Sequence, residues 1–340
     1  MVIIESQNLF FSIPSIKWSS SRLERFLECN LKDYYTYIHP VRLATNADLT
    51  LGKFVHSMIE KFWNDKELPK YKTVDTFKNA MKAKWNFMVS QGTSRGQPLK
   101  WRTKQEPWIY RNKMLGLTEI IYKRCSEIGQ PKYAEYPFDF VLGGVRFIGS
   151  IDELRNPRTV IDHKNYGEYF DPKAPEFQEK LDKKLQLTVY SLAVAVNAYL
   201  DQKFASSLEI EVNRKLSWEE NLESISSKLD IFMHLVRTGE HIPTQRRTIN
   251  QYKDLFDLVK KIDEQRARNI FTPNRGNHCY NCNAFEQCTY DTEHGLLPVQ
   301  KEDGQLSLLE SIQIYPEPVS LIKPRNKKEK KKTRQRRLKF

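Results

Sequence analysis

The stretch from Tyr133 to Lys164, YAEYPFDFVLGGVRFIGSIDELRNPRTVIDHK, decides the fold that we predict for this chain. Gly143-Gly144 is a strong hairpin signal, and Asn156-Pro157 marks a second turn. The residues around these turns form three runs rich in apolar and aromatic side chains: Tyr133–Leu142, Val145–Leu154 and Arg158–Lys164. The stretch therefore predicts a meander of three neighbouring strands.

Three charged residues of this meander stand where they can meet. On an extended strand, residues two apart point to the same face, so Asp162 and Lys164 project together. Neighbouring strands lie roughly 5 Å apart, which brings Asp152 at the end of the second strand within reach. Two carboxylates can hold a divalent metal, and a lysine beside them can orient a water. These groups suit hydrolysis of a phosphodiester, although an isolated Asp-x-Lys is also common on solvated surfaces.

Helical periodicity lies on both sides of the predicted meander. Apolar residues recur at helical spacing over about 21–38, 50–62, 73–91, 105–128, 176–200, 217–238 and 248–269. One more strand is predicted at Ser207–Asn213. Helices, then a meander, then further helices with a strand predict an α/β domain with a mixed central sheet flanked by helices.

Four short motifs follow one another along the chain. They are Gly52-x-x-x-His56 on an early helix, Gly149-x-x-Asp152, Asp162-x-Lys164, and Gln186-x-x-x-Tyr190 on the helix after the meander. Their order and spacing resemble the PD-(D/E)XK nucleases, specifically the RecB-like branch. The resemblance covers about residues 20–290. It implies a restriction-endonuclease-like core at 1–290 with a helical insertion at about 65–130, followed by a flexible tail at 291–340.

The resemblance also implies the ligands of a metal ion. His56, Asp152 and Asp162 would hold Mg²⁺ or Mn²⁺, and the main-chain carbonyl of His163 is a possible further ligand. Imidazole suits a transition ion such as Mn²⁺ better than it suits Mg²⁺. Without the resemblance, His56 would be interpreted as a surface histidine. Glu135 stands where such nucleases often carry an acidic residue, and a solvated edge residue is an equally good interpretation.

The remaining motif residues would act on the substrate. In the hydrolysis that the resemblance implies, water attacks the scissile phosphate in a two-metal type of reaction. Lys164 would position this water beside Asp152 and Asp162. Gln186 and Tyr190 lie one helical turn apart on one helix face, where they would place the DNA strand.

Four of the five cysteines suggest a second metal site. Cys279-x-x-Cys282 followed by Cys288 is a strong metal signal that lacks its fourth ligand. The iron–sulfur subset of RecB-like nucleases, including AddB, combines one early and three late cysteines around a [4Fe–4S] cluster that staples the nuclease domain closed. Cys29 matches the early position. Cys125 is left over and is more simply a buried, inert thiol.

Zinc stays open as the alternative to this cluster. Four thiolates also suit zinc, and His278 next to Cys279 is able to replace Cys29 in a local Cys/His site. We favour the cluster because its cysteine spacing matches and because such clusters prefer four thiolate ligands.

The C-terminal segment predicts contacts with partners. From Lys323 to Phe340 the chain holds 11 of its 55 Lys and Arg residues but one of its 42 acidic residues, a composition that attracts polyanions such as DNA. Before it, Gln305–Leu309 resembles the Gln-Leu-Ser-Leu-Phe peptides with which bacterial proteins dock on the sliding clamp, with Leu in place of Phe. Folding of this peptide back onto the body is an equal alternative.

The predicted activity is metal-dependent DNA cleavage, as an exonuclease on ends or single strands in recombination, repair or replication. Two alternatives stay open: a CRISPR-associated nuclease that trims ends for spacer acquisition, and a non-catalytic DNA-binding scaffold subunit of a helicase–nuclease complex. The chain has no G-x-x-x-x-G-K-[ST] phosphate loop, so it is either a stand-alone nuclease or a subunit lent to a helicase.

The N-terminus and the hydropathy predict the location. Met1–Glu5 lacks the basic start and apolar stretch of a signal peptide, and no apolar run is long enough to span a membrane. We therefore expect a cytoplasmic, nucleoid-associated protein, or one in the host cytoplasm if a phage encodes it.

Overall fold

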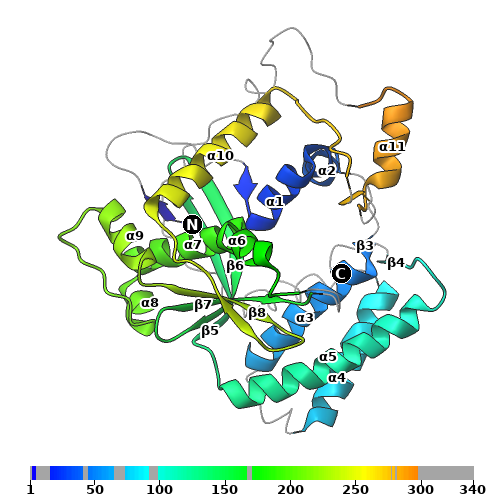
Figure 1. The fold of residues 1–340 in the computed structure, drawn as a ribbon, viewed down its shortest axis with the longest axis horizontal. Helices are drawn as coiled ribbons and strands as arrows, with labels where there is room; N and C mark the ends of the chain where they lie inside the picture. The colour runs from blue at the N-terminus through cyan, green and yellow to red at the C-terminus, as the bar shows by residue number, and fades with distance from the viewer. Residues whose placement is uncertain are drawn as a thin grey trace, which may run out of the picture.

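The protein is built around a mixed sheet (Figure 1). The computed structural model describes residues 2–4, 16–40, 45–64, 73–91, 99–166, 171–276, 278–279 and 282–297. Within these residues, seven strands form the sheet: β1 (Val2–Ile4), β2 (Lys17–Trp18), β5 (Tyr133–Leu142), β6 (Val145–Arg155), β7 (Thr159–Lys164), β8 (Asp230–Leu235) and β9 (His241–Pro243). Their order is β1-β5-β6-β7-β8-β9, with β2 paired to β6. A small separate sheet pairs β3 (Thr45–Asn46) with β4 (Leu99–Lys100).

The meander predicted from the sequence is confirmed. β5 pairs with β6 and β6 with β7 in antiparallel fashion, and Gly143 and Gly144 turn between the first two with positive φ angles. The mixed character comes from parallel pairs, β7 with β8 on one side and β1 with β5 on the other. The fold is therefore the expected α/β arrangement.

Helices cover both faces of the sheet (Figure 1). One group is α1 (Ser20–Glu28), α2 (Asn30–Asp33), the π-helical turn Tyr34–Ile38, α6 (Pro175–Asp182), α7 (Leu185–Leu200), α8 (Gln202–Ser207), α9 (Trp218–Ser226), α10 (Ile249–Ala267) and α11 (Phe285–Glu293). α7 is apolar around its whole circumference because it is buried in this core. A second core joins α3 (Ala47–Asn64), α4 (Val74–Gln91) and α5 (Glu106–Ile128). No helix among the described residues is long and apolar enough to cross a membrane.

Two predicted elements are wrong. The predicted helix 217–238 ends at Ser226, and its second half is strand β8, in which buried Ile231, Met233 and Leu235 alternate with other residues. This period of two is that of a strand, and hydrogen bonds to β7 complete it. The predicted strand 207–213 is a loop after α8. Its apolar residues alternate, but Glu209 has a φ of +57°, which breaks the extended conformation.

Two predicted helices are interrupted. The segment 21–38 breaks at Cys29, which is extended between α1 and α2. The segment 176–200 breaks at Lys183 and Lys184, so that α7 begins at Leu185.

Gly149 lies where β6 passes under an aromatic ring. A Cβ atom added here would lie 2.5 Å from Cζ of Phe138, whose ring meets the ring of Tyr190 edge-on at 6.4 Å. Only a residue without a side chain fits this contact, so Gly149 allows the Phe138 ring to pack between the sheet and α7.

We expect Gly149→Ala to lower the free energy of unfolding by about 1–3 kcal/mol, because an added methyl group overpacks this contact. Gly116→Ala in α5 is the matched control. Its new Cβ would meet no described atom within 4 Å, so it should stabilise the helix by about 0.5–1 kcal/mol. Urea unfolding followed by circular dichroism measures both changes, and an unchanged midpoint for Gly149→Ala would contradict the packing argument.

Candidate active site

Two strands part at the centre of the candidate site. The β6–β7 ladder ends with the pair Glu153 and Ile161. One residue further on each strand stand Asp152 and Asp162, which are 5% and 0% exposed. The main-chain N–H of His163 donates a 2.8 Å hydrogen bond to Oδ2 of Asp152. The Asp152 carboxylate therefore accepts a main-chain N–H of β7 just beyond the point where the ladder ends.

A chain of hydrogen bonds joins four motif residues to Asp152. Lys164 Nζ donates to Oδ1 of Asp162 at 3.0 Å and to Oε1 of Gln186 at 2.8 Å. Gln186 Nε2 donates to the hydroxyl of Tyr190 at 2.8 Å, and this hydroxyl lies 3.4 Å from Oδ1 of Asp152. The residues come from β6, β7 and α7, so the fold brings together side chains that are up to 38 positions apart in the chain.

His56 and Glu135 lie on the other side of Asp152. Nδ1 of His56 lies 3.4 Å from Oδ2 of Asp152 and 3.7 Å from Oε1 of Glu135. The ligand atoms of these three residues all lie within 4.8 Å of one another. The β5–β6 ladder pairs Ala134 and Tyr136 but skips Glu135, whose φ is +51°. Such a backbone costs a non-glycine residue about 1–3 kcal/mol, and here it turns the carboxylate toward the site.

The charges of the site compensate one another. Burial lowers the pKa of His56, but the nearby carboxylate of Asp152 outweighs it and raises that pKa to about 10. Burial likewise raises the pKa of Asp152, and the His56 imidazolium reverses the effect, so the net pKa is lowered. The pKa of Asp162 is raised, chiefly by burial. For Lys164, burial lowers the pKa, but the charges of Asp162 and Asp152 and the hydrogen bond to Asp162 together outweigh burial, so the pKa is raised.

The donor atoms of this site fit a divalent metal. Oδ2 of Asp162 is buried and accepts no hydrogen bond from any described residue. Buried polar atoms are almost always satisfied, so this oxygen calls for a further partner. Carboxylate oxygens with one imidazole nitrogen suit Mn²⁺, and the oxygens alone suit Mg²⁺. His56, Glu135, Asp152 and Asp162 are the side chains that would hold such an ion.

Two residues at this site were not assigned a role from the sequence alone. Glu135 lies in the group with His56 and Asp152, whereas its role from the sequence alone was open. Lys184 was missed: it is half-buried at the start of α7, and burial together with the charge of Lys164 lowers its pKa. Its position two residues before Gln186 was the only available signal.

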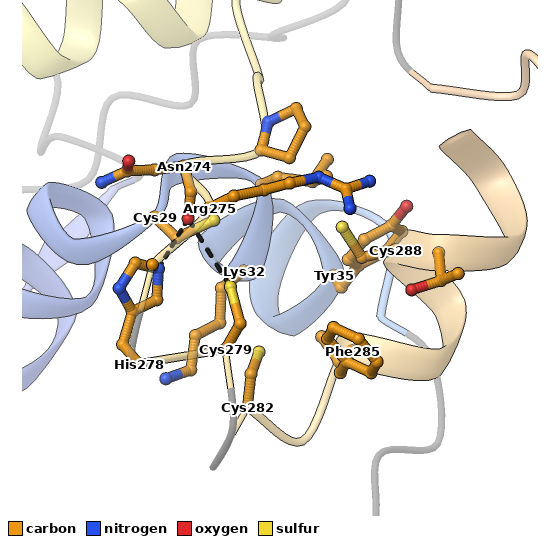
Figure 2. Close-up of a pocket in the computed structure, with 15 residues that line it drawn as sticks. Cys29, Lys32, Tyr35, Asn274, Arg275, His278, Cys279, Cys282, Phe285 and Cys288 are labelled. Atoms are coloured by element: carbon orange, nitrogen blue, oxygen red, sulfur yellow. Dashed lines mark hydrogen bonds between the residues drawn. The ribbon is translucent and has the colours of Figure 1, made fainter. Parts of the chain in front are cut away.

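The four cysteines other than Cys125 line one cavity, of about 250 Å³ (Figure 2). Cys29 comes from the junction of α1 and α2, Cys279 and Cys282 from the segment before α11, and Cys288 from α11 itself. In Figure 2 their sulfur atoms face a common space. Cys125 is buried on α5, away from them.

Direct contacts hold the early and late segments together. Asn30 accepts a hydrogen bond from the main-chain N–H of Thr272 at 2.8 Å and donates one to the carbonyl of Ile270 at 3.2 Å. The buried hydroxyl of Tyr35 donates to Asp291 of α11. Residues 240 or more positions apart in the chain therefore lie side by side at the cysteine cavity.

Comparison with known proteins agrees with this geometry. The family model of the PD-(D/E)XK nuclease superfamily matches residues 17–289, which contain all the candidate metal ligands and the four cysteines described above. No curated protein matches the chain.

Asp162 should limit the stability of the metal-free protein. Because burial and the charge of Asp152 disfavour its ionised form, we expect Asp162→Asn to raise the free energy of unfolding in the presence of a chelator by on the order of 1 kcal/mol. Mn²⁺ should stabilise the wild-type protein and have a smaller effect on the variant. Thermal unfolding with and without Mn²⁺ measures both effects, and a variant that is less stable without metal would contradict this account.

Proposed function

Because the chain belongs to the PD-(D/E)XK nuclease superfamily, we propose that it is a DNA exonuclease that acts on ends or single strands in recombination, repair or replication. Membership of the superfamily itself implies a metal-dependent nuclease, generally with Mg²⁺ or Mn²⁺, and DNA as substrate. The observation that carries the proposal is the buried pair Asp152 and Asp162, tied to Lys164 by hydrogen bonds.

Each side chain has a part in this proposal. Lys164 has three N–H donors, and Asp162 and Gln186 take two of them. The third can orient a water or a phosphate oxygen. Gln186 is itself fixed by Tyr190, so the position of the ammonium group depends on α7. A bound metal would supply Lewis acidity and lower the pKa of water.

We place the chain in the RecB-like branch and assign its cysteine cavity to a [4Fe–4S] cluster, with structural zinc as the alternative. The support is the common cavity that Cys29, Cys279, Cys282 and Cys288 line. Lys32 and Arg275 line the same cavity, and their positive charges offset the negative charge of thiolate ligands. The role of the cluster would be to close a long loop of the chain, which removes entropy from the unfolded state.

The proposed partners beyond DNA rest on the sequence. Gln305–Leu309 and the basic segment 323–340 lie outside the described residues. It remains a prediction that a sliding clamp binds the first segment and that DNA binds the second. A helicase is the third predicted partner. The division into a nuclease domain at 1–290 and a tail at 291–340 remains a proposal too, and helix α11 spans the proposed boundary.

Lys164→Ala should reduce DNA cleavage at least about 10²-fold, because it removes the group that orients the nucleophile. The assay is digestion of end-labelled single- and double-stranded DNA with Mg²⁺ or Mn²⁺, using protein purified without oxygen. Lys228→Ala is the matched control, because this exposed lysine pairs only with Glu211 in the described structure and should leave the rate unchanged. The product ladder distinguishes exonuclease from endonuclease action.

Full cleavage by Lys164→Ala would contradict the assignment of this lysine. Wild-type protein that is folded and loaded with its cluster, yet cleaves no DNA with either metal, would contradict the nuclease proposal itself.

Cys282→Ser should remove the proposed cluster, because the remaining ligands no longer close the site. We expect about four iron and four sulfide per wild-type chain, a broad visible absorption, and the loss of both in the variant. Cys125→Ser is the control and should keep the full iron content. One zinc per chain with no iron, after anaerobic purification, would show the zinc alternative to be right.

A further inference from the structure

A row of polar side chains, buried except for the exposed His241 at its end, runs across the sheet behind the candidate active site. It consists of Glu153 on β6, His163 on β7, His234 on β8 and His241 on β9. The strand register aligns the histidines, since His163 pairs with His234 and His234 with His241. Side chains alternate along a strand, so the imidazole of His163 points to the face opposite Asp162.

The row is held by close contacts. Nε2 of His163 lies 3.1 Å from Oε2 of Glu153, and Nδ1 of His163 lies 2.8 Å from Nδ1 of His234. The rings of His234 and His241 stack with 4.5 Å between centroids. Glu153, His163 and His234 are only 4%, 4% and 5% exposed. Burial of such groups is costly unless they are paired, so an apolar row would fill the same space at lower cost.

Helices α3 and α5 close the row, and α5 anchors its first member. Ile59 and Trp63 of α3 and Cys125 of α5 line the same small cavity as Glu153 and the histidines. Arg155 forms an ion pair with Glu153 and donates hydrogen bonds to the carbonyls of Ile128 and Gly129 at the end of α5. Glu153 is therefore fixed relative to α5 as well as to the sheet.

One hydrogen bond and one side-chain contact cross between β6 and β7 at the point where their ladder ends. On one face the side chain of Asp152 accepts a hydrogen bond from the main-chain N–H of His163. On the other face the side chain of the next residue, Glu153, contacts the ring of His163. The segment of β7 that carries Asp162 is thus held from both faces, where main-chain pairing to β6 has stopped.

We propose that Glu153 and His163 are positioning residues that brace the parted strands and so set the separation of the two buried carboxylates, Asp152 and Asp162. The proposal rests on the metal-dependent activity proposed above. Supporting groups outside the immediate ligand shell typically change metal affinity 10–100-fold. His234 contacts the ring of His163 from β8. His241, at the end of the row, makes no described bond to Glu153 or to β7.

The test measures Mn²⁺ binding to the full-length protein without DNA, by titration calorimetry. Glu153→Gln removes the carboxylate charge but keeps the shape of the side chain. His163→Gln removes the imidazole ring but keeps one N–H donor. Each variant therefore removes part of the brace with little change of volume. Both should weaken Mn²⁺ binding about tenfold or more, and both should need correspondingly more Mn²⁺ for half-maximal cleavage. His241→Gln, the same substitution at the end of the row, should bind Mn²⁺ within about twofold of wild type.

The outcomes separate the brace from the proposed function. Folded variants with wild-type affinity for Mn²⁺ would overturn the brace, even if their thermal stability fell, because a purely structural role moves stability alone. If His163→Gln does not fold, the isosteric Glu153→Gln decides. If wild-type protein cleaves DNA and the variants bind Mn²⁺ with the same affinity as wild type, the brace is overturned and the nuclease proposal stands. If wild-type protein neither cleaves DNA nor binds Mn²⁺, both are overturned.

Discussion

The end of the β6–β7 ladder is the constraint on which the rest of the site depends. Two charges as close as Asp152 and Asp162 can be buried only where neighbouring groups compensate them. The parting of the strands provides the space, and the N–H of His163, the ammonium of Lys164 and the imidazole of His56 provide the compensation. One carboxylate oxygen of Asp162 is left without a described partner, as expected of a metal ligand in the metal-free protein.

Elements that are far apart in the chain supply the other residues of this site. α7 brings Gln186 and Tyr190, α3 brings His56, and a strained backbone at Glu135 turns a third carboxylate inward. The cysteine cavity lies where the first helices meet the last one, and hydrogen bonds already join these segments there. A cluster in this cavity would lock α1, which packs against α7, and so act on the site through the core.

Local sequence signals predicted the parts of the fold that depend on local chemistry. The glycine turn at Gly143-Gly144 and the apolar runs beside it gave three strands correctly, because turn residues and alternation act over a few positions. β8 escaped detection because its residues follow a helix without a strong turn signal, and its partner β7 lies about 70 positions earlier. The positive φ of Glu135 occurs where the β5–β6 ladder skips a residue, and the row from Glu153 to His241 is aligned by pairing between strands. No local pattern records either feature.

Anomalous diffraction from crystals grown with Mn²⁺ tests most directly whether the parted strands β6 and β7 form a metal site. We expect a manganese peak in contact with Asp152 and Asp162, with His56 or Glu135 completing the ligands. Data collected at the iron edge from the same crystals would locate the proposed cluster independently. Crystals saturated with Mn²⁺ that show no peak between these carboxylates, or a peak only elsewhere, would contradict the claim.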